Sequence, residues 1–217
     1  MPHPTTLTSE VTPSLPELFR TAAEKVSAVV SEVRTLEAAL EYAADLCSRK
    51  EACQLLASGC AEPLSPAAGT LCAAKAAKIM TAPDLDPQAW TTLNRLCTQR
   101  GILLAGGSMR NHLSGIDIGL TMAQWGIAET GTLVIDSSRE TVRLATMISE
   151  IHVAILPLSR IRSDAFELQK ELRACMQKAS NYLAFITGAS RTADIERVLA
   201  IGVHGPLELH ILLLEDH

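Results

Sequence analysis

The residues best suited to chemistry form one short block after an apolar run near the C-terminus. The block holds a glycine that permits a tight turn, two hydroxyls, a guanidinium and a carboxylate: Gly188, Ser190, Thr192, Arg191 and Asp194. These residue types predict that a helix begins within the block. Because the first turn of a helix has unpaired N–H groups, the block predicts a cradle for an anionic ligand.

The same block also has a purely structural interpretation. Ser190 or Thr192 can cap the following helix, and Asp194 can interact with the positive end of that helix. Arg191 can pair with the same carboxylate three residues further on. The residue types by themselves leave both interpretations open.

A glutamate beside a glycine turn is the second candidate. Glu129 lies between two apolar runs and is followed by Thr130, Gly131 and Thr132. At the end of a strand, its carboxylate could orient a hydroxyl, act as a general base or attack an acyl group. The alternative is an ordinary turn with a solvated glutamate, which the local residues favour.

A histidine held among glycines is the third candidate. His204 precedes Gly205 in a loop before the last apolar run, and an imidazole can exchange protons near neutral pH. A hydrogen-bonded structural histidine is the commoner outcome, and we expect His152, at the start of another apolar run, to be one. Because Gly205 and Pro206 interrupt any strand that would join His204 to His210, we expect no metal site.

The cysteine spacing and the absence of several known motifs argue against bound cofactors in this chain. The chain has six cysteines but no C-x-x-C pair, so neither zinc-finger nor iron–sulfur ligation is indicated, and we expect buried, reduced thiols. The motifs G-x-G-x-x-G, G-x-x-x-x-G-K-[ST], H-E-x-x-H and G-x-S-x-G do not occur. We therefore expect no redox cofactor in this chain, and no dehydrogenase that acts by itself.

Composition favours one globular domain with an aliphatic core. Of 217 residues, 47% are hydrophobic and 20% are charged, and the aromatic residues are two Trp, two Tyr and three Phe. Because the net charge is −5 and the sequence has no Lys/Arg block, we expect no nucleic-acid partner. Apolar stretches end before the ~18 residues that a spanning helix needs. The N-terminus lacks a signal-peptide pattern, so we expect a cytoplasmic protein without a membrane span.

Hydrophobic spacing predicts the N-terminal elements. Residues 1–16 are rich in proline and predict an extended arm. Apolar residues at every third or fourth position predict a helix over 16–33 and a second helix over 35–50. We therefore divide the chain into the arm, N-terminal helices over 17–50 that pack on the core, and an α/β domain over 51–217.

The rest of the chain alternates strands with helices. Strands are predicted over 52–57, 102–105, 152–156, 183–186 and 208–214, with two short strands between 116 and 136 and helices over 88–100, 140–149 and 163–179. This alternation predicts an α/β fold with a mostly parallel sheet flanked by helices. Ligands of such sheets usually bind beyond the carboxyl ends of the strands, where we expect the pocket.

Several separated blocks together are similar to one known family. They are residues 127–134, 187–196 and 202–206, with Arg143 and residues 152–156 between the first two. On these blocks the chain resembles the LUD-domain family. A single block would be weak, but their order along the chain makes the resemblance specific.

The resemblance covers about residues 14–217, with one departure at Ala189, where a proline is expected. It implies a fold similar to that of the phosphosugar isomerase and CoA-transferase superfamily. It also implies membership of a multi-subunit system that oxidises L-lactate to pyruvate. In that system companion subunits carry the iron–sulfur clusters, which agrees with the lack of cluster spacing in this chain.

The resemblance further implies that the candidate residues form one anion-binding pocket. In it Arg191 would hold a small anion, such as lactate, pyruvate or a phosphorylated compound, and Glu129 would orient it. The predicted ligand-binding residues are Thr130, Gly131, Thr132, Gly188, Ser190, Arg191, Thr192, Asp194, His204 and Gly205, with Glu129 as the catalytic candidate.

Two other functions stay open. The chain could be an acyl or CoA transferase, or a sugar-phosphate isomerase, that uses Glu129 as nucleophile or base. It could instead be a non-catalytic scaffold whose proline-rich arm and first helices dock partners. A homo-oligomer is compatible with each of these functions.

Overall fold

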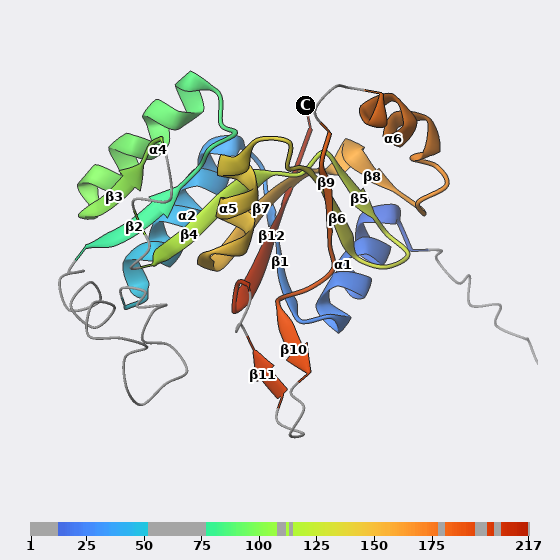
Figure 1. The fold of residues 1–217 in the computed structure, drawn as a ribbon, viewed down its shortest axis with the longest axis horizontal. Coiled ribbons are helices and arrows are strands. Elements are labelled where there is room, and N and C mark those ends of the chain that lie inside the picture. The colour runs from blue at the N-terminus through green and yellow to red at the C-terminus, as the bar shows by residue number, and fades with distance from the viewer. Residues whose placement is uncertain are drawn as a thin grey trace, which may run out of the picture.

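In the described part of the computed structural model, the strands fall into three sheets, with helices on both sides of the largest one (Figure 1). The structure describes residues 13–51, 77–107, 112, 115–177, 181–193, 199–201 and 205–216. The strand predicted over 52–57 and most of the predicted arm lie outside the described residues.

The N-terminal segment holds a helix and a strand where one helix was predicted. Helix α1, Leu15–Lys25, begins at a capping box in which the Glu17 carboxylate accepts from the Ser14 N–H at 2.7 Å. The helix ends before Ser27, whose φ of 67° is incompatible with its continuation. Strand β1, Ala28–Val33, follows, so the prediction of helix up to residue 33 is wrong.

The largest sheet has six strands in the order β1-β12-β7-β4-β2-β3, and all its neighbours are parallel. This result confirms the predicted α/β architecture with a mostly parallel sheet. The short strand β2 had not been predicted, and residues 116–136 form three strands rather than the predicted two. The other strands of this sheet, and the two helices on one of its faces, are α2 Leu36–Arg49, β2 Lys78–Thr81, α4 Pro87–Gln99, β3 Ile102–Ala105, β4 Ile116–Met122, β7 Ser149–Pro157 and β12 Glu208–Leu214.

A second sheet of four short strands has the order β8-β5-β6-β9. Its β6 pairs antiparallel with both β5 and β9. The predicted helix over 163–179 is shorter in the structure, where it covers α6. The elements of this part are β5 Trp125–Ile127, β6 Thr132–Asp136, η2 Leu158–Arg160, β8 Ile161–Arg162, α6 Gln169–Met176 and β9 Leu183–Ile186. Helix α5, Glu140–Met147, follows β6 along the chain but packs against β4 and β7 of the larger sheet.

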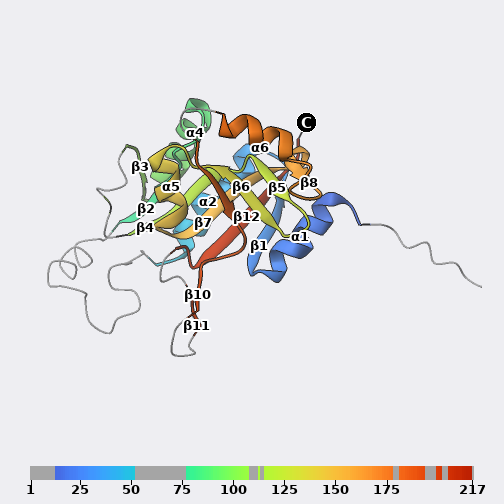
Figure 2. The same cartoon turned by 45° about the vertical axis from the view of Figure 1, so that its right-hand side comes forward.

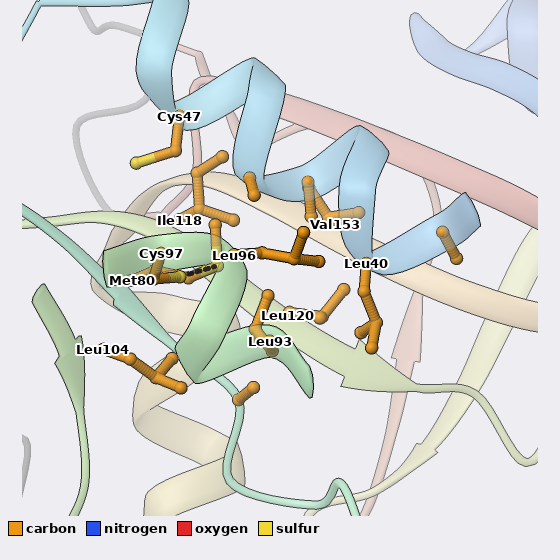
Figure 3. Packing of buried hydrophobic residues seen from close by; sticks show 14 of the residues in the cluster. Leu40, Cys47, Met80, Leu93, Leu96, Cys97, Leu104, Ile118, Leu120 and Val153 are labelled. Atoms are coloured by element: carbon orange, nitrogen blue, oxygen red, sulfur yellow. Dashed lines mark hydrogen bonds between the residues drawn. The ribbon is translucent and has the colours of Figure 1, made fainter. Parts of the chain in front are cut away.

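Apolar side chains fill both faces of the six-stranded sheet. On one face, α2 and α4 pack against the central strands through residues such as Leu40, Leu93 and Ile118, which are at most 1% exposed (Figure 3). On the other face, Phe19 of α1 and Leu133 of β6 belong to a second cluster. Burial on both faces explains why these strands have continuous apolar sequences.

Two short strands form a separate hairpin. Strand β10, Arg191–Ala193, pairs antiparallel with β11, Leu199–Ile201. Both views show the hairpin extending away from the two larger sheets (Figures 1 and 2). The helix predicted to begin in this block is therefore wrong over Arg191–Ala193, which form a strand instead.

Candidate functional site

Two of the predicted blocks meet beside α5. The Ser190 N–H donates to the carbonyl of Pro206 at 3.0 Å, and a Cβ added to Gly205 would lie 3.0 Å from the Ser190 hydroxyl. These residues and Gly188 line a pocket of about 280 Å³, together with side chains from α5, β7 and β9. We call this cavity the α5 pocket. It brings together three of the predicted ligand-binding residues.

The α5 pocket lies near the amino ends of two parallel strands. It is lined by His152, the fourth residue of β7, and by Leu209, the second residue of β12, and the two are register partners. The expected place beyond the carboxyl ends therefore does not hold for the strands of the six-stranded sheet, whereas Gly188 and Ser190 do follow the carboxyl end of β9. A smaller hollow of about 170 Å³ does lie beyond β2 and β3, and it is lined by Trp90 and Arg139 but by none of the predicted site residues that the structure describes.

The strongest charged group of the α5 pocket is the Arg143 guanidinium. Its Nη1 donates to the carbonyls of Ser137 and Ser138 at 2.6 and 2.9 Å. Its Cζ also lies 5.6 Å from the centroid of the Tyr182 ring, within the range of a cation–π contact. Both hydrogen bonds use Nη1, so neither occupies Nε or Nη2. The residue is thus a fixed, permanently positive group with a fork suited to a carboxylate.

The remaining polar groups leave this positive charge unbalanced. His152 is fully buried, and burial lowers the pKa of its imidazole to about 4, so the ring is neutral at pH 7. Its Nε2 lies 2.9 Å from the Thr121 hydroxyl. None of the described residues that line the pocket is acidic. The α5 pocket therefore favours an anionic ligand over a cationic one.

The segment around Glu129, which includes Thr130 and Thr132, lies partly beside the segment around Gly188, which includes Thr187. The Thr132 hydroxyl is 2.6 Å from that of Thr130 and 2.7 Å from that of Thr187. This contact follows from the antiparallel pairing of β6 with β9, which brings residues far apart in sequence together. The structure therefore joins the two blocks at their threonines.

Glu129 itself lines a different hollow from Gly188, Ser190 and Gly205. This hollow of about 420 Å³ lies against α1 and is also lined by Lys25 and Asp164. The Glu129 side chain is exposed, and its main-chain N–H donates to the Ser163 carbonyl at 2.9 Å. The single pocket implied for all candidate residues is therefore divided, and a catalytic role for Glu129 stays a prediction.

Two of the predicted ligand-binding glycines have a visible packing role. Gly131 and Gly188 have φ values of 64° and 76°, in the left-handed region. A Cβ on Gly131 would lie 2.3 Å from the Ala23 nitrogen, and one on Gly188 would lie 2.2 Å from the Val26 oxygen. Both turns therefore need glycine in order to approach the last turn of α1.

Other predicted site residues cannot be placed by their side chains. Arg191 and Thr192 belong to β10, but their side chains lie outside the described part of the structure, as do Asp194 and His204 entirely. Their predicted roles in ligand binding stay predictions. The residues that sequence reasoning missed are Arg143, Ser137 and Tyr182. Of these three, only Arg143 had a signal in the sequence, because it is one of the residues on which the resemblance to the family rests.

The cysteines that the structure describes are free thiols. Cys47 and Cys97 are buried, and burial raises their pKa to about 12 and about 11. The Cys97 sulfur lies 3.9 Å from that of Met80 in the core (Figure 3). This confirms the expected buried thiols at these two positions. Among the described residues, no group of three or more His, Cys, Asp or Glu side chains could hold a metal ion.

Helices long and apolar enough to cross a bilayer are absent from the described part of the chain.

Comparison with known proteins places the chain in a family. The sequence model of the LUD domain matches residues 16–214, so the chain belongs to the LUD domain family. It is similar to lactate utilization protein C of Halalkalibacterium halodurans, with 34% identity over 103 residues. The corresponding protein of Bacillus subtilis is 32% identical over 103 residues.

These curated relatives are matched over only part of their length. The match covers 46% of this chain and 45% of the H. halodurans protein, and 46% and 43% in the B. subtilis case. A crystal structure of a DUF162 family protein from Deinococcus radiodurans shares the fold, with a TM-score of 0.57. That similarity covers 94% of this chain and 99% of the other at 18% identity.

Proposed function

We propose that this chain is a component of an L-lactate utilisation system and binds a small carboxylate, L-lactate or pyruvate, in the α5 pocket. The similarity to lactate utilization protein C supports the assignment of this chain to such a system. The chemistry of the α5 pocket supports the ligand class. Family and fold alone would not assign a ligand, because one fold hosts many functions.

The observation that carries the ligand class is the environment of Arg143. Two main-chain carbonyls fix its Nη1, and Tyr182 lies against the guanidinium, so the group is already oriented before a ligand arrives. Arginine binds carboxylates through paired, charge-assisted hydrogen bonds, and Nε with Nη2 offers such a pair. The neutral His152 adds no charge that would oppose or duplicate this interaction.

Oxidation of lactate also requires an electron acceptor, which we assign to iron–sulfur partner subunits. In this proposal the present chain supplies the carboxylate site, and the partners carry the electrons. Co-expression of the full chain with the iron–sulfur lactate-utilisation proteins of its own genome, followed by size-exclusion chromatography, tests the assembly. Co-elution is expected, and elution of this chain alone under all conditions would contradict the assignment.

Titration calorimetry tests the binding site directly. L-lactate, pyruvate and glycerol 3-phosphate are titrated into the wild-type protein, Arg143→Gln and Arg143→Lys. Hydrogen bonds to charged groups contribute about 1.5–3 kcal/mol. Loss of the fork should therefore weaken carboxylate binding about tenfold to a hundredfold in Arg143→Gln. Arg143→Lys retains the charge but not the fork, so its affinity should lie between the two.

Arg160→Gln is the matched control, because this arginine is exposed and does not line the α5 pocket. It should bind lactate like the wild type. Thermal unfolding of each variant shows whether the fold survives the loss of the two bonds to the Ser137 and Ser138 carbonyls. Equal carboxylate affinity in a folded Arg143→Gln protein and the wild type would remove Arg143 from the site. Preference for the phosphate ester would instead identify a phosphorylated ligand.

A further inference from the structure

One buried hydroxyl in the α5 pocket has no hydrogen-bond partner among the described residues. Ser137 is 0% exposed, its N–H donates to the Tyr182 carbonyl at 2.7 Å, and its carbonyl accepts from Arg143 Nη1 at 2.6 Å. Its Oγ makes no hydrogen bond within the described part of the chain. Buried polar atoms are nearly always hydrogen-bonded, so an unpaired hydroxyl in a cavity wall points to a ligand.

The position of this hydroxyl next to Arg143 narrows the class of acid that the α5 pocket can recognise. Arg143 binds the main-chain carbonyl of the same serine, and both residues line the α5 pocket, so Ser137 and the guanidinium are neighbours in its wall. In α-hydroxy and α-keto acids, the second oxygen is on the carbon next to the carboxylate. Rotation about χ1 moves the serine hydroxyl between staggered positions without moving the main chain. The hydroxyl can therefore turn toward that second oxygen.

Two other polar side chains of the pocket wall already have partners. Thr146 of α5 donates its hydroxyl to the Arg143 carbonyl at 2.9 Å. The Nε2 of His152 faces the Thr121 hydroxyl. Ser137 is thus the lining residue whose buried side-chain oxygen lacks a partner among the described residues.

We propose that Ser137 is a specificity-determining residue that hydrogen-bonds the α-oxygen of the bound acid. The α5 pocket then selects α-hydroxy and α-keto acids over simple carboxylates of the same size. This inference rests on the proposed function. A serine hydroxyl is both donor and acceptor, so it can donate to the keto oxygen of pyruvate and can also pair with the hydroxyl of lactate. One residue thereby serves both members of the redox pair.

Competition between matched acids tests the proposal. Affinities of L-lactate, pyruvate and propionate are measured for the wild type, Ser137→Ala and the control Ser159→Ala. Ser159 is exposed and lies outside the α5 pocket. Lactate and pyruvate would each make one neutral hydrogen bond to the buried hydroxyl, whereas propionate would leave that hydroxyl unpaired. The wild type should therefore prefer lactate and pyruvate to propionate about tenfold. In Ser137→Ala this preference should fall to near unity while propionate affinity stays unchanged.

The outcomes separate this inference from the proposed function. If propionate binds the wild type as tightly as lactate, or if Ser137→Ala keeps the preference, the role of Ser137 is overturned and the carboxylate site stands. If none of the three acids binds the wild type, the proposed function fails and this inference fails with it. Loss of an unpaired hydroxyl should not unfold the protein, and thermal unfolding of Ser137→Ala verifies that.

Discussion

Replacement of Gly131 by alanine should destabilise the protein strongly because the turn lies against the main chain of α1. The new Cβ would lie 2.3 Å from the Ala23 nitrogen and 2.5 Å from its Cα, and no side chain is available there to move aside. Residue 131 also has a φ of 64°. The left-handed conformation costs an L-residue about 1–2 kcal/mol. Overpacking adds about 1–3 kcal/mol, so the total loss should be about 2–5 kcal/mol.

Gly101→Ala is the matched control for this prediction. Gly101 has a similar φ of 66°, but a Cβ there would meet no atom within 4 Å. Its replacement should therefore cost only the conformational part, about 1–2 kcal/mol. Urea unfolding followed by circular dichroism gives both free energies. If the two variants lose the same stability, contact between this turn and α1 does not explain the glycine, and the packing argument is wrong.

Two predictions concern pH and have opposite signs. Burial lowers the pKa of His152 from 6.5 to about 4, so only the unfolded state binds a proton between these values. The free energy of unfolding of the wild type should therefore fall as pH drops through this range, by up to about 1.4 kcal/mol per pH unit. In His152→Gln this contribution to the pH dependence of stability should be absent. Burial raises the pKa of Asp84 from 3.8 to about 6, although its carboxylate accepts from the Met122 N–H. Here the native state binds the proton first, so this group lowers stability as pH rises from about 4 to 6. Asp84→Asn should remove that loss. Urea unfolding at several pH values checks both, and parallel pH profiles of wild type and variant would contradict either prediction.

Much of the fold follows from local patterns in the sequence. The apolar run at Ile102–Ala105 forms the predicted strand β3, and the Thr35 hydroxyl caps α2 by accepting from the Ala38 N–H at 3.1 Å. The first error concerned β1. Val29 and Val33 fit a helical spacing, but the same segment also fits a strand, and it pairs with β12 at the other end of the chain. Such distant pairing cannot be read from local spacing.

The candidate site was predictable only in part, for the same reason. Gly188, Ser190 and Gly205 line one pocket because the main chains of two neighbouring blocks hydrogen-bond to each other. Arg143 was harder to recognise, because its role depends on carbonyls in the turn after β6 and on Tyr182 before β9. The helix predicted from capping residues near Arg191 was wrong because that segment pairs as a hairpin instead.

A crystal structure of the protein soaked with L-lactate would test the carboxylate site most directly. We predict electron density for the acid in the α5 pocket, with its carboxylate on Nε and Nη2 of Arg143. Density for the acid beside Glu129 in the hollow against α1, with none at Arg143, would contradict the account.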